Sequence, residues 1–169
     1  EIAGQHILVR VDFNVPLDGE RVVDDTRVCA SLPTIRYILD QGGVAVLISH
    51  LGRPKGKVVS ELSLHPVAEC LEEHLGVEVH ETRDCVGPET ESIVKRAKPG
   101  SVVLLENLRF HPEEENNDPG FALQLCEYGS AYVNDAFGTA HRAHASTEGV
   151  THNFVSCAAG FLLEKEIRY

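Results

Sequence analysis

The sequence lacks the short motifs that would assign a chemistry at once. It contains neither a G-x-x-x-x-G-K-[ST] loop nor a G-x-G-x-x-G pattern, so the common nucleotide-phosphate loops are not predicted. It also has no C-x-x-C pair and no H-E-x-x-H pattern, which argues against the usual zinc sites. Methionine is absent too, so there is no initiator residue, which indicates either processing or a piece of a longer chain.

Long apolar runs and an excess of positive charge are also missing. No run is long enough to span a membrane, and the first residues do not resemble a signal peptide. Lys and Arg total 15 against 26 Asp and Glu, giving a net charge of −11. Such a chain repels nucleic acid and anionic membranes, so we expect neither as a partner. Any anion site must therefore be a local basic cluster.

The cysteines are few and widely spaced. Their number is odd, and most lie in apolar segments, at positions Cys29, Cys70, Cys85, Cys126 and Cys157. We therefore expect mostly buried free thiols in a reducing compartment, the cytoplasm.

The 169 residues, 43% of them hydrophobic, suit one domain with a substantial core. Strands are predicted over residues 7–15, 44–48, 77–80, 102–105, 131–133 and, less regularly, 154–159. Helices are predicted between them: one with Pro33 in its first turn that ends before Gly42, then 66–76, 88–98, 119–129 and 160–169. The acidic run 113–115 is expected to be a solvated loop. This alternation predicts a three-layer α/β/α, doubly wound (Rossmann-like) and mainly parallel sheet.

Residues 7–16 form the stretch around which the chain is organised. The segment begins as a buried strand, and its side chains then alternate between the two faces. Asp12 and Asn14 therefore point the same way just before Pro16 ends the strand. An Asp/Asn turn at a strand end is a common structural feature, so these two residues alone do not establish a binding site.

Other predicted strands also end in polar groups. His50 and Arg53 follow the second strand, Arg109 follows the fourth, and His141 and Arg142 lie in the loop after the fifth. Ligands of parallel α/β sheets bind beyond the carboxyl ends of the strands, where these groups would converge. Arginine forks suit carboxylate and phosphate.

The remaining groups refine the predicted ligand. Asp12 would repel an anion unless it accepts a hydrogen bond from a hydroxyl group. Gly52 and Gly138 would let the backbone come close to it. A phosphorylated hydroxy acid fits this set of groups.

Four motifs together resemble the phosphoglycerate kinase family. They are V-R-V-D-F-N-V-P at 9–16, S-H-L-G-R-P at 49–54, L-E-N-L-R-F at 105–110 and N-D-A-F-G-T-A-H-R-A-H at 134–144. They occur in the family's order over nearly the whole chain. A fifth segment, A-G-F-L-L-E-K-E at 159–166, resembles the place where that enzyme leaves its N-terminal domain. The resemblance implies the half of a glycolytic kinase that binds 3-phosphoglycerate or 1,3-bisphosphoglycerate.

The resemblance also implies roles for single residues. It places Arg27 at the transferred phosphoryl group, as the catalytic residue, and Asp12 on the substrate hydroxyl. Further substrate ligands are implied at Asn14, His50, Arg53, Arg109 and Arg142. The substrate ligands would be supported by three neighbouring residues that do not themselves bind the substrate: His141, Gly52 and Gly138. No metal ligand is implied. The role of Arg27 rests on the resemblance alone.

The family's nucleotide-binding half has no counterpart in this sequence. The resemblance implies a substrate-binding domain over residues 1–159 and, over 160–169, the start of the helix that leads to a second domain. Mg-ATP or Mg-ADP would bind on that second domain, and no cofactor is expected on this chain. We expect a monomer that binds substrate, contacts the second domain of its parent chain and does not turn over alone.

Two other interpretations stay open at this stage. A histidine-based metalloprotein is suggested by nine histidines, with His141 and His144 three residues apart. An isolated folding module without activity would share the fold and the site.

At single positions, Arg10 is expected to be ion-paired inside the fold. Glu106 and Asn107 are expected to cap loop backbone.

Overall fold

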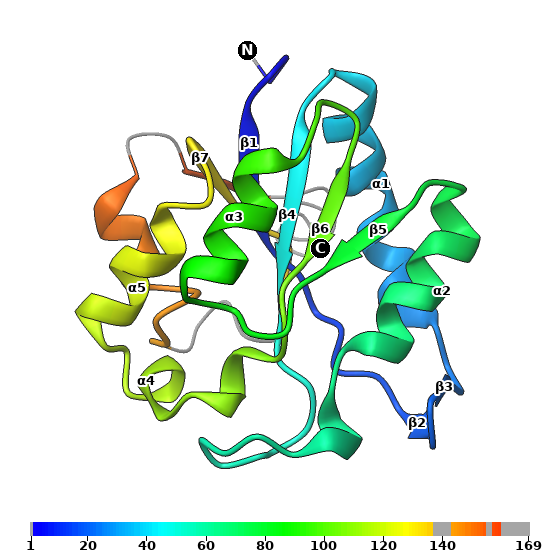
Figure 1. Cartoon of the computed structure of the whole chain (residues 1–169), viewed down its shortest axis with the longest axis vertical. Coiled ribbons are helices and arrows are strands. Elements are labelled where there is room, and N and C mark those ends of the chain that lie inside the picture. Colours follow the sequence, from blue (N-terminus) through cyan, green and yellow to red (C-terminus); the bar gives the residue numbers. More distant parts are fainter. Residues whose placement is uncertain (1, 137–142, 155–156, 160–169) are drawn as a thin grey trace, which may run out of the picture.

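The protein, seen here as a computed structural model that describes residues 2–136, 143–154 and 157–159, is built on a parallel sheet (Figure 1). Its six strands run in the order β5 (Val79–Glu81), β6 (Val102–Leu104), β4 (Val44–Ile48), β1 (His6–Arg10), β7 (Ala131–Asn134) and β8 (Cys157–Ala159). All pairings in this sheet are parallel. The predicted doubly wound α/β fold is confirmed.

Helices cover both faces of the sheet (Figure 1). One face packs against α1 (Thr26–Asp40) and α2 (His65–Leu75), and the other against α3 (Pro88–Arg96) and α5 (Pro119–Cys126). Shorter elements connect them: a hairpin of β2 (Leu17–Asp18) and β3 (Arg21–Val22), the 3-10 turns η1 (Ser60–Leu62), η2 (Leu108–Phe110) and η4 (Gly149–Asn153), and α4 (Pro112–Glu115).

The central strand shows why the sheet needs both layers. Ile7 and Val9 of β1 are buried in the cluster that includes α1 and α2, whereas Leu8 is buried in the cluster on the opposite face. Strand side chains alternate between faces, so a run of apolar residues can bury both sides only between two helical layers. β1 therefore lies at the centre of the molecule, with its carboxyl end flanked by β4 and β7.

The first helix begins earlier than predicted. The sequence interpretation placed Pro33 in the first turn, but α1 starts at Thr26 and Pro33 lies in its interior. The Asp24 carboxylate accepts hydrogen bonds from both the backbone N–H (2.9 Å) and the hydroxyl (2.6 Å) of Thr26, which favours an early helix start. Buried apolar residues on both sides of the proline, such as Val28 and Ile35, hold the helix together despite the missing N–H.

The acidic run was also predicted wrongly. Residues 112–115 form the short helix α4, and Glu114 is fully buried instead of lying on a solvated loop. Pro112 fits the first helical position, and acidic side chains are favourable near a helix N-terminus. The sequence pattern of three consecutive acids does not show which of them turns inward.

Some other local predictions are confirmed. The Asp118 carboxylate accepts from the N–H of Phe121 at 2.9 Å and caps α5, and Gly76 ends α2 with a positive φ of 71°. Among the described cysteines, Cys85 is buried, but Cys29, Cys70 and Cys126 are partly exposed and in no disulfide, so the prediction of mostly buried thiols is wrong for these three. No helix among the described residues has the length and apolarity needed to cross a membrane. The predicted helix over 160–169 lies outside the described residues.

Candidate functional site

Loops at the carboxyl edge of the sheet are bonded to one another. The N–H of Val11 donates to the carbonyl of Ile48 at 3.0 Å, so the chain after β1 continues beside the end of β4. Phe13 N–H donates to Ser49 Oγ at 3.0 Å, and Leu108 N–H donates to Ser49 O at 3.0 Å. The loops after β1, β4 and β6 thus form one connected surface, as the strand-end argument predicted.

Three of the predicted site residues meet in one cluster on this surface. Arg27, near the start of α1, lies with Nη1 at 3.6 Å from Asp12 Oδ1, and the same Nη1 donates to the carbonyl of Asn14. Asp12 Oδ1 also accepts from the Asn14 N–H at 3.2 Å. The Arg27 side chain is 53% exposed and that of Asp12 20%, so a ligand can reach both. We call Asp12, Asn14 and Arg27 the open cluster.

Gly52 belongs to the same region. Its N–H donates a hydrogen bond to Asn14 Oδ1 at 2.9 Å. Because only the oxygen of the Asn14 amide can accept this bond, the NH₂ group of the same amide points away from Gly52. Gly52 has φ of +65°, and a Cβ at this position would come within 2.8 Å of the Leu62 side chain. Glycine is therefore needed both for the backbone conformation and for the space.

His50 lies deeper and contacts a buried arginine. Its Nδ1 is 2.8 Å from Arg10 Nη2, and its side chain is buried. An arginine nitrogen can only donate, so Nδ1 must accept, and the proton of the neutral imidazole is then on Nε2. His50 is thus held in the tautomer that donates from Nε2.

Arg10 connects His50 to a second set of residues, which we call the buried network: Arg10, Ser146 and Glu114. Arg10 Nε donates to Ser146 Oγ at 2.9 Å, and Ser146 donates to Glu114 from its N–H at 2.8 Å and from its hydroxyl. Burial lowers the pKa of Arg10, and the Glu114 charge opposes that shift. Arg10 is therefore a buried structural residue, although its link to an acid runs through Ser146 and not through a direct ion pair.

Arg109 lies on η2 and is positioned by the residue two before it. Asn107 Oδ1 accepts from the Arg109 N–H at 3.0 Å and from Leu51 N–H at 3.2 Å, while Asn107 Nδ2 donates to Leu51 O at 2.8 Å. Arg109 is 7% exposed, and its buried Nε has no hydrogen-bond partner among the described residues. A buried donor without a partner is costly, which suits a place where a ligand completes the bonding.

His144 shares this electrostatic environment. Burial lowers its pKa first, and the positive charges of Arg109 and Arg10 lower it further against the opposing charge of Glu114. The buried surroundings therefore favour the neutral form of His144 beside the guanidinium groups of Arg109 and Arg10. An anion would be stabilised here by the same charges that disfavour an additional proton.

Not every predicted site residue that the structure describes lies in the open cluster. Arg53 is exposed on the loop after β4 and makes no hydrogen bond or ion pair with any residue that the structure describes. Gly138, His141 and Arg142 lie outside the described residues.

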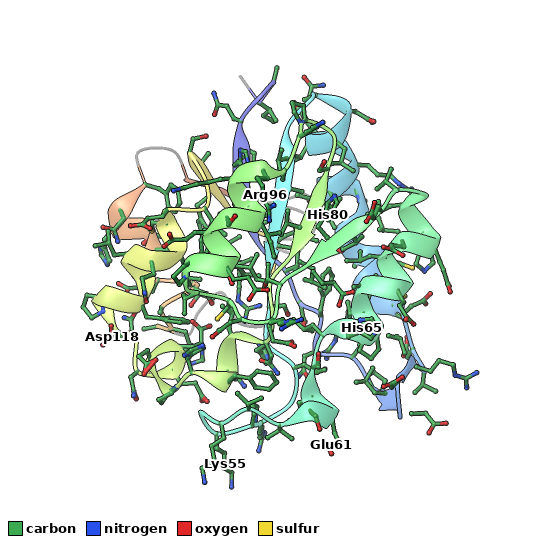
Figure 2. All side chains as sticks on the ribbon, in the orientation of Figure 1. Lys55, Glu61, His65, His80, Arg96 and Asp118 are labelled. Atoms are coloured by element: carbon green, nitrogen blue, oxygen red, sulfur yellow. The ribbon has the colours of Figure 1, made fainter. Side chains whose placement is uncertain are left out.

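A pocket of about 610 Å³ lies beside the open cluster and is lined by Asn14 and Gly52 together with β2 and η1. Two of its other lining residues, Glu61 and His65, are labelled in Figure 2. No arginine is among its described lining residues. The pocket is therefore next to the predicted anion site and does not coincide with it.

Sequence reasoning missed two supporting residues. Glu114 and Ser146 hold Arg10, yet both come from segments far from it in sequence, so no local pattern could pair them. Glu106 and Asn107 were expected to cap loop backbone, and this is confirmed: Glu106 Oε1 accepts from the Leu64 N–H at 2.9 Å.

Two sets of donor groups with metal-ligand chemistry include none of the predicted site residues: Asp25–Cys29–His74 and Asp84–Cys85–His111. The histidine pair that suggested a metalloprotein includes His141, which lies outside the described residues.

Comparison with known proteins decides the family. The family model described as phosphoglycerate kinase matches residues 1–169. The chain belongs to the phosphoglycerate kinase family. It is 64% identical over 167 residues to the phosphoglycerate kinase of Moorella thermoacetica and 56% identical over 169 residues to that of Chlorobaculum tepidum. These alignments cover 99% of this chain but 42% and 43% of the relatives.

Solved structures give the same result. The phosphoglycerate kinase of Coxiella burnetii superimposes with a TM-score of 0.86 at 35% identity, and that of Pyrococcus horikoshii OT3 with 0.88 at 34%. The matches cover 99% of this chain and 41% and 42% of those chains. The chain therefore spans about two fifths of the length of the family members it matches.

Proposed function

We propose that this chain is the substrate-binding part of a phosphoglycerate kinase and binds 3-phosphoglycerate or 1,3-bisphosphoglycerate. The open cluster is the observation that carries this proposal. It combines a guanidinium that is half exposed with a carboxylate and a carboxamide, at the carboxyl edge of the sheet. A phosphorylated hydroxy acid offers the matching groups, since its anionic ends suit arginine and its hydroxyl suits Asp12.

Each side chain has a proposed role. Arg27 stabilises the charge of the phosphoryl group during transfer, and Asp12 accepts a hydrogen bond from the substrate hydroxyl. Asn14, His50, Arg53, Arg109 and Arg142 are the further ligands of the substrate. Phosphoryl transfer depends mainly on positioning and on charge stabilisation, so this chain needs no covalent nucleophile.

The second substrate is proposed to bind elsewhere. We propose that Mg-ADP or Mg-ATP occupies the part of the family's length that this chain does not span, and that the two parts act together in glycolysis. The chain alone would then bind 3-phosphoglycerate, as a monomer, without turnover.

An NMR titration at low salt tests this function, because screening weakens exposed charge interactions. We expect saturable shifts of the Asn14 and Gly52 amides with 3-phosphoglycerate, weak shifts with glycerate, which lacks the phosphate, and none with Mg-ATP. Arg109→Lys should weaken binding by at least about tenfold, because a lysine cannot reproduce a guanidinium fork. Arg96→Lys on α3 (labelled in Figure 2) is the matched control and should bind normally. Equal responses to glycerate and 3-phosphoglycerate, or turnover by the chain alone, would contradict the proposal.

A further inference from the structure

A cluster of mixed metal-ligand donors lies between α1 and α2 and contains none of the residues assigned to substrate, although Asp25 and Cys29 each lie two residues from Arg27. It consists of Asp25 just before α1, Cys29 one turn into α1, and His74 in the last turn of α2. His74 Nε2 is 2.8 Å from Asp25 Oδ2 and 3.7 Å from Cys29 Sγ, and the three donor atoms all lie within 4.8 Å of one another. We propose that Asp25, Cys29 and His74 form a binding site for a zinc-like divalent cation.

The geometry suits tetrahedral coordination. Ligand bonds of about 2.0 to 2.3 Å place neighbouring donors about 3.3 to 3.8 Å apart in a tetrahedral zinc site. The sulfur–nitrogen separation of 3.7 Å already falls in this range. The oxygen and nitrogen are closer, because in the cation-free state they share a hydrogen bond or ion pair, and they would separate by about half an ångström on binding.

The side chains are accessible and their backbone is fixed. The His74 side chain is 32% exposed and that of Asp25 48%, so a cation can enter without opening the core. Arg36 Nη2 donates to the His74 carbonyl at 2.7 Å and ties the end of α2 to α1. The three ligands therefore come from two helices that are already held together, which lowers the ordering cost of binding.

The charges around the cluster favour a cation. A pocket of about 260 Å³ next to it is lined by four acidic residues, Glu20, Asp25, Glu69 and Glu73, together with Cys70 and one basic residue, Arg21. The opposing positive charges are Arg21, in that pocket, and Arg36, which acts on Cys29. Burial and the Asp25 charge raise the pKa of Cys29, so the thiol keeps its proton until a cation replaces it, and binding should release that proton.

Cys70 lies nearby but is not one of the three residues whose donor atoms meet within 4.8 Å. It lies one turn before His74 on α2, and burial with the charges of Asp25, Glu73 and Cys29 raises its pKa to about 11. A water molecule would complete four-coordination. The other donor set, Asp84–Cys85–His111, is less suited because Cys85 is fully buried, and a cation could reach its sulfur only by opening the core.

Titration of the purified protein with Co²⁺, followed by Zn²⁺ competition, tests the site in the presence of a phosphine reductant. We expect one equivalent of Co²⁺ to give the intense visible bands of tetrahedral cobalt and a thiolate charge-transfer band, with release of about one proton. Cys29→Ser should abolish the charge-transfer band, and His74→Gln should weaken binding at least about tenfold.

Controls from the second donor set keep the test specific. Cys85→Ser and His111→Gln should leave the cobalt spectrum and affinity unchanged, and circular dichroism would check that each variant is folded. Asp25→Asn, which keeps the shape of the side chain, should bind more weakly and provides a further test if Cys29→Ser unfolds. The proposal is overturned if the bands survive in both Cys29→Ser and His74→Gln, if only His111→Gln removes them, or if no thiolate band forms.

Discussion

Two arginines at the same edge of the sheet are held in opposite ways. Arg10 of the buried network is fully buried, and its guanidinium bonds to Ser146, His50 and the backbone of Val11. Arg27 of the open cluster has a side chain that is 53% exposed and contacts Asp12 at 3.6 Å. One guanidinium has exchanged its water for fixed protein partners, and the other is still half solvated.

This difference in exposure distinguishes an arginine that supports the fold from one that is available to bind a ligand. A buried charge is expensive unless all its partners are in place, so Arg10 has a fixed position and in turn orients His50. An exposed arginine pairs weakly and can turn toward an anion at little cost. The buried network therefore fixes the position of His50 beneath the surface. We propose that the substrate binds at the open cluster.

Glu114→Gln should give the largest loss of stability. The substitution removes the acidic charge nearest to the buried guanidinium network while keeping the side-chain shape. Glu114 is linked to Arg10 through Ser146, so the substitution weakens two charge-assisted hydrogen bonds from Ser146, and we expect a cost of about 3 kcal/mol. Urea denaturation measures this loss. The adjacent Glu115→Gln is the matched control, since Glu115 is exposed, and it should change stability by less than about 0.5 kcal/mol. Equal effects of the two substitutions would show that Arg10 does not depend on Glu114.

Gly52→Ala should cost about 2 kcal/mol and also weaken 3-phosphoglycerate binding. A positive φ costs about 1 kcal/mol for a residue with a Cβ, and the clash with Leu62 at 2.8 Å adds to it. Gly76→Ala isolates the first contribution, because Gly76 has φ of +71° but nothing within 4 Å of its Cβ position. If Gly76→Ala cost as much as Gly52→Ala, the close approach to Leu62 would be irrelevant.

The same contrast explains what could be predicted from sequence. Asp12 and Asn14 were found because the alternation of apolar and polar residues is local and the strand-end rule is topological, and the structure joins both residues to Arg27. The predicted strand over residues 7–15 was too long, because β1 ends at Arg10 and both residues follow it. Glu114 was missed because three adjacent acids look solvated, and only the contact with Ser146 shows that one of them is buried. The role of Arg27 came from family resemblance alone, since an exposed arginine near a helix start has no distinguishing pattern.

The Asp84–His111 pair is intermediate in exposure and should be intermediate in effect. The hydrogen bond to Asp84, 2.6 Å long, raises the pKa of His111. Burial would raise the pKa of Asp84, but the hydrogen bond and charge of His111 outweigh it, and that pKa is lowered. The stabilisation from His111 is complete below its unfolded pKa of about 6.5 and is lost as the pH rises through the raised folded value.

Asp84 stabilises the folded state in the opposite pH range. Its stabilisation is complete above its unfolded pKa of about 4 and is lost as the pH falls through the lowered folded value. His111→Gln should therefore cost about 1 kcal/mol near pH 5.5, after allowance for solvent screening, and clearly less at pH 9. Thermal unfolding at the two pH values measures the difference. His80→Gln, at a partly exposed histidine 3.9 Å from Glu78, is the control, and a larger loss at pH 9 than at pH 5.5 would reverse the assigned sign.

Arg27→Lys should have the smallest effect on stability and a clear effect on binding. The Arg27 contact with Asp12 is exposed, so its loss should change the free energy of unfolding by no more than about 0.5 kcal/mol. A lysine keeps the charge but not the planar fork, so the affinity for the doubly anionic substrate should fall by about tenfold. Urea denaturation and the NMR titration measure the two effects on the same variant. Arg36→Lys, on the same helix, is the control and should leave substrate affinity unchanged. If Arg27→Lys instead lost stability as Glu114→Gln does, the open cluster would be part of the structural support, and the division between the two arginines would fail.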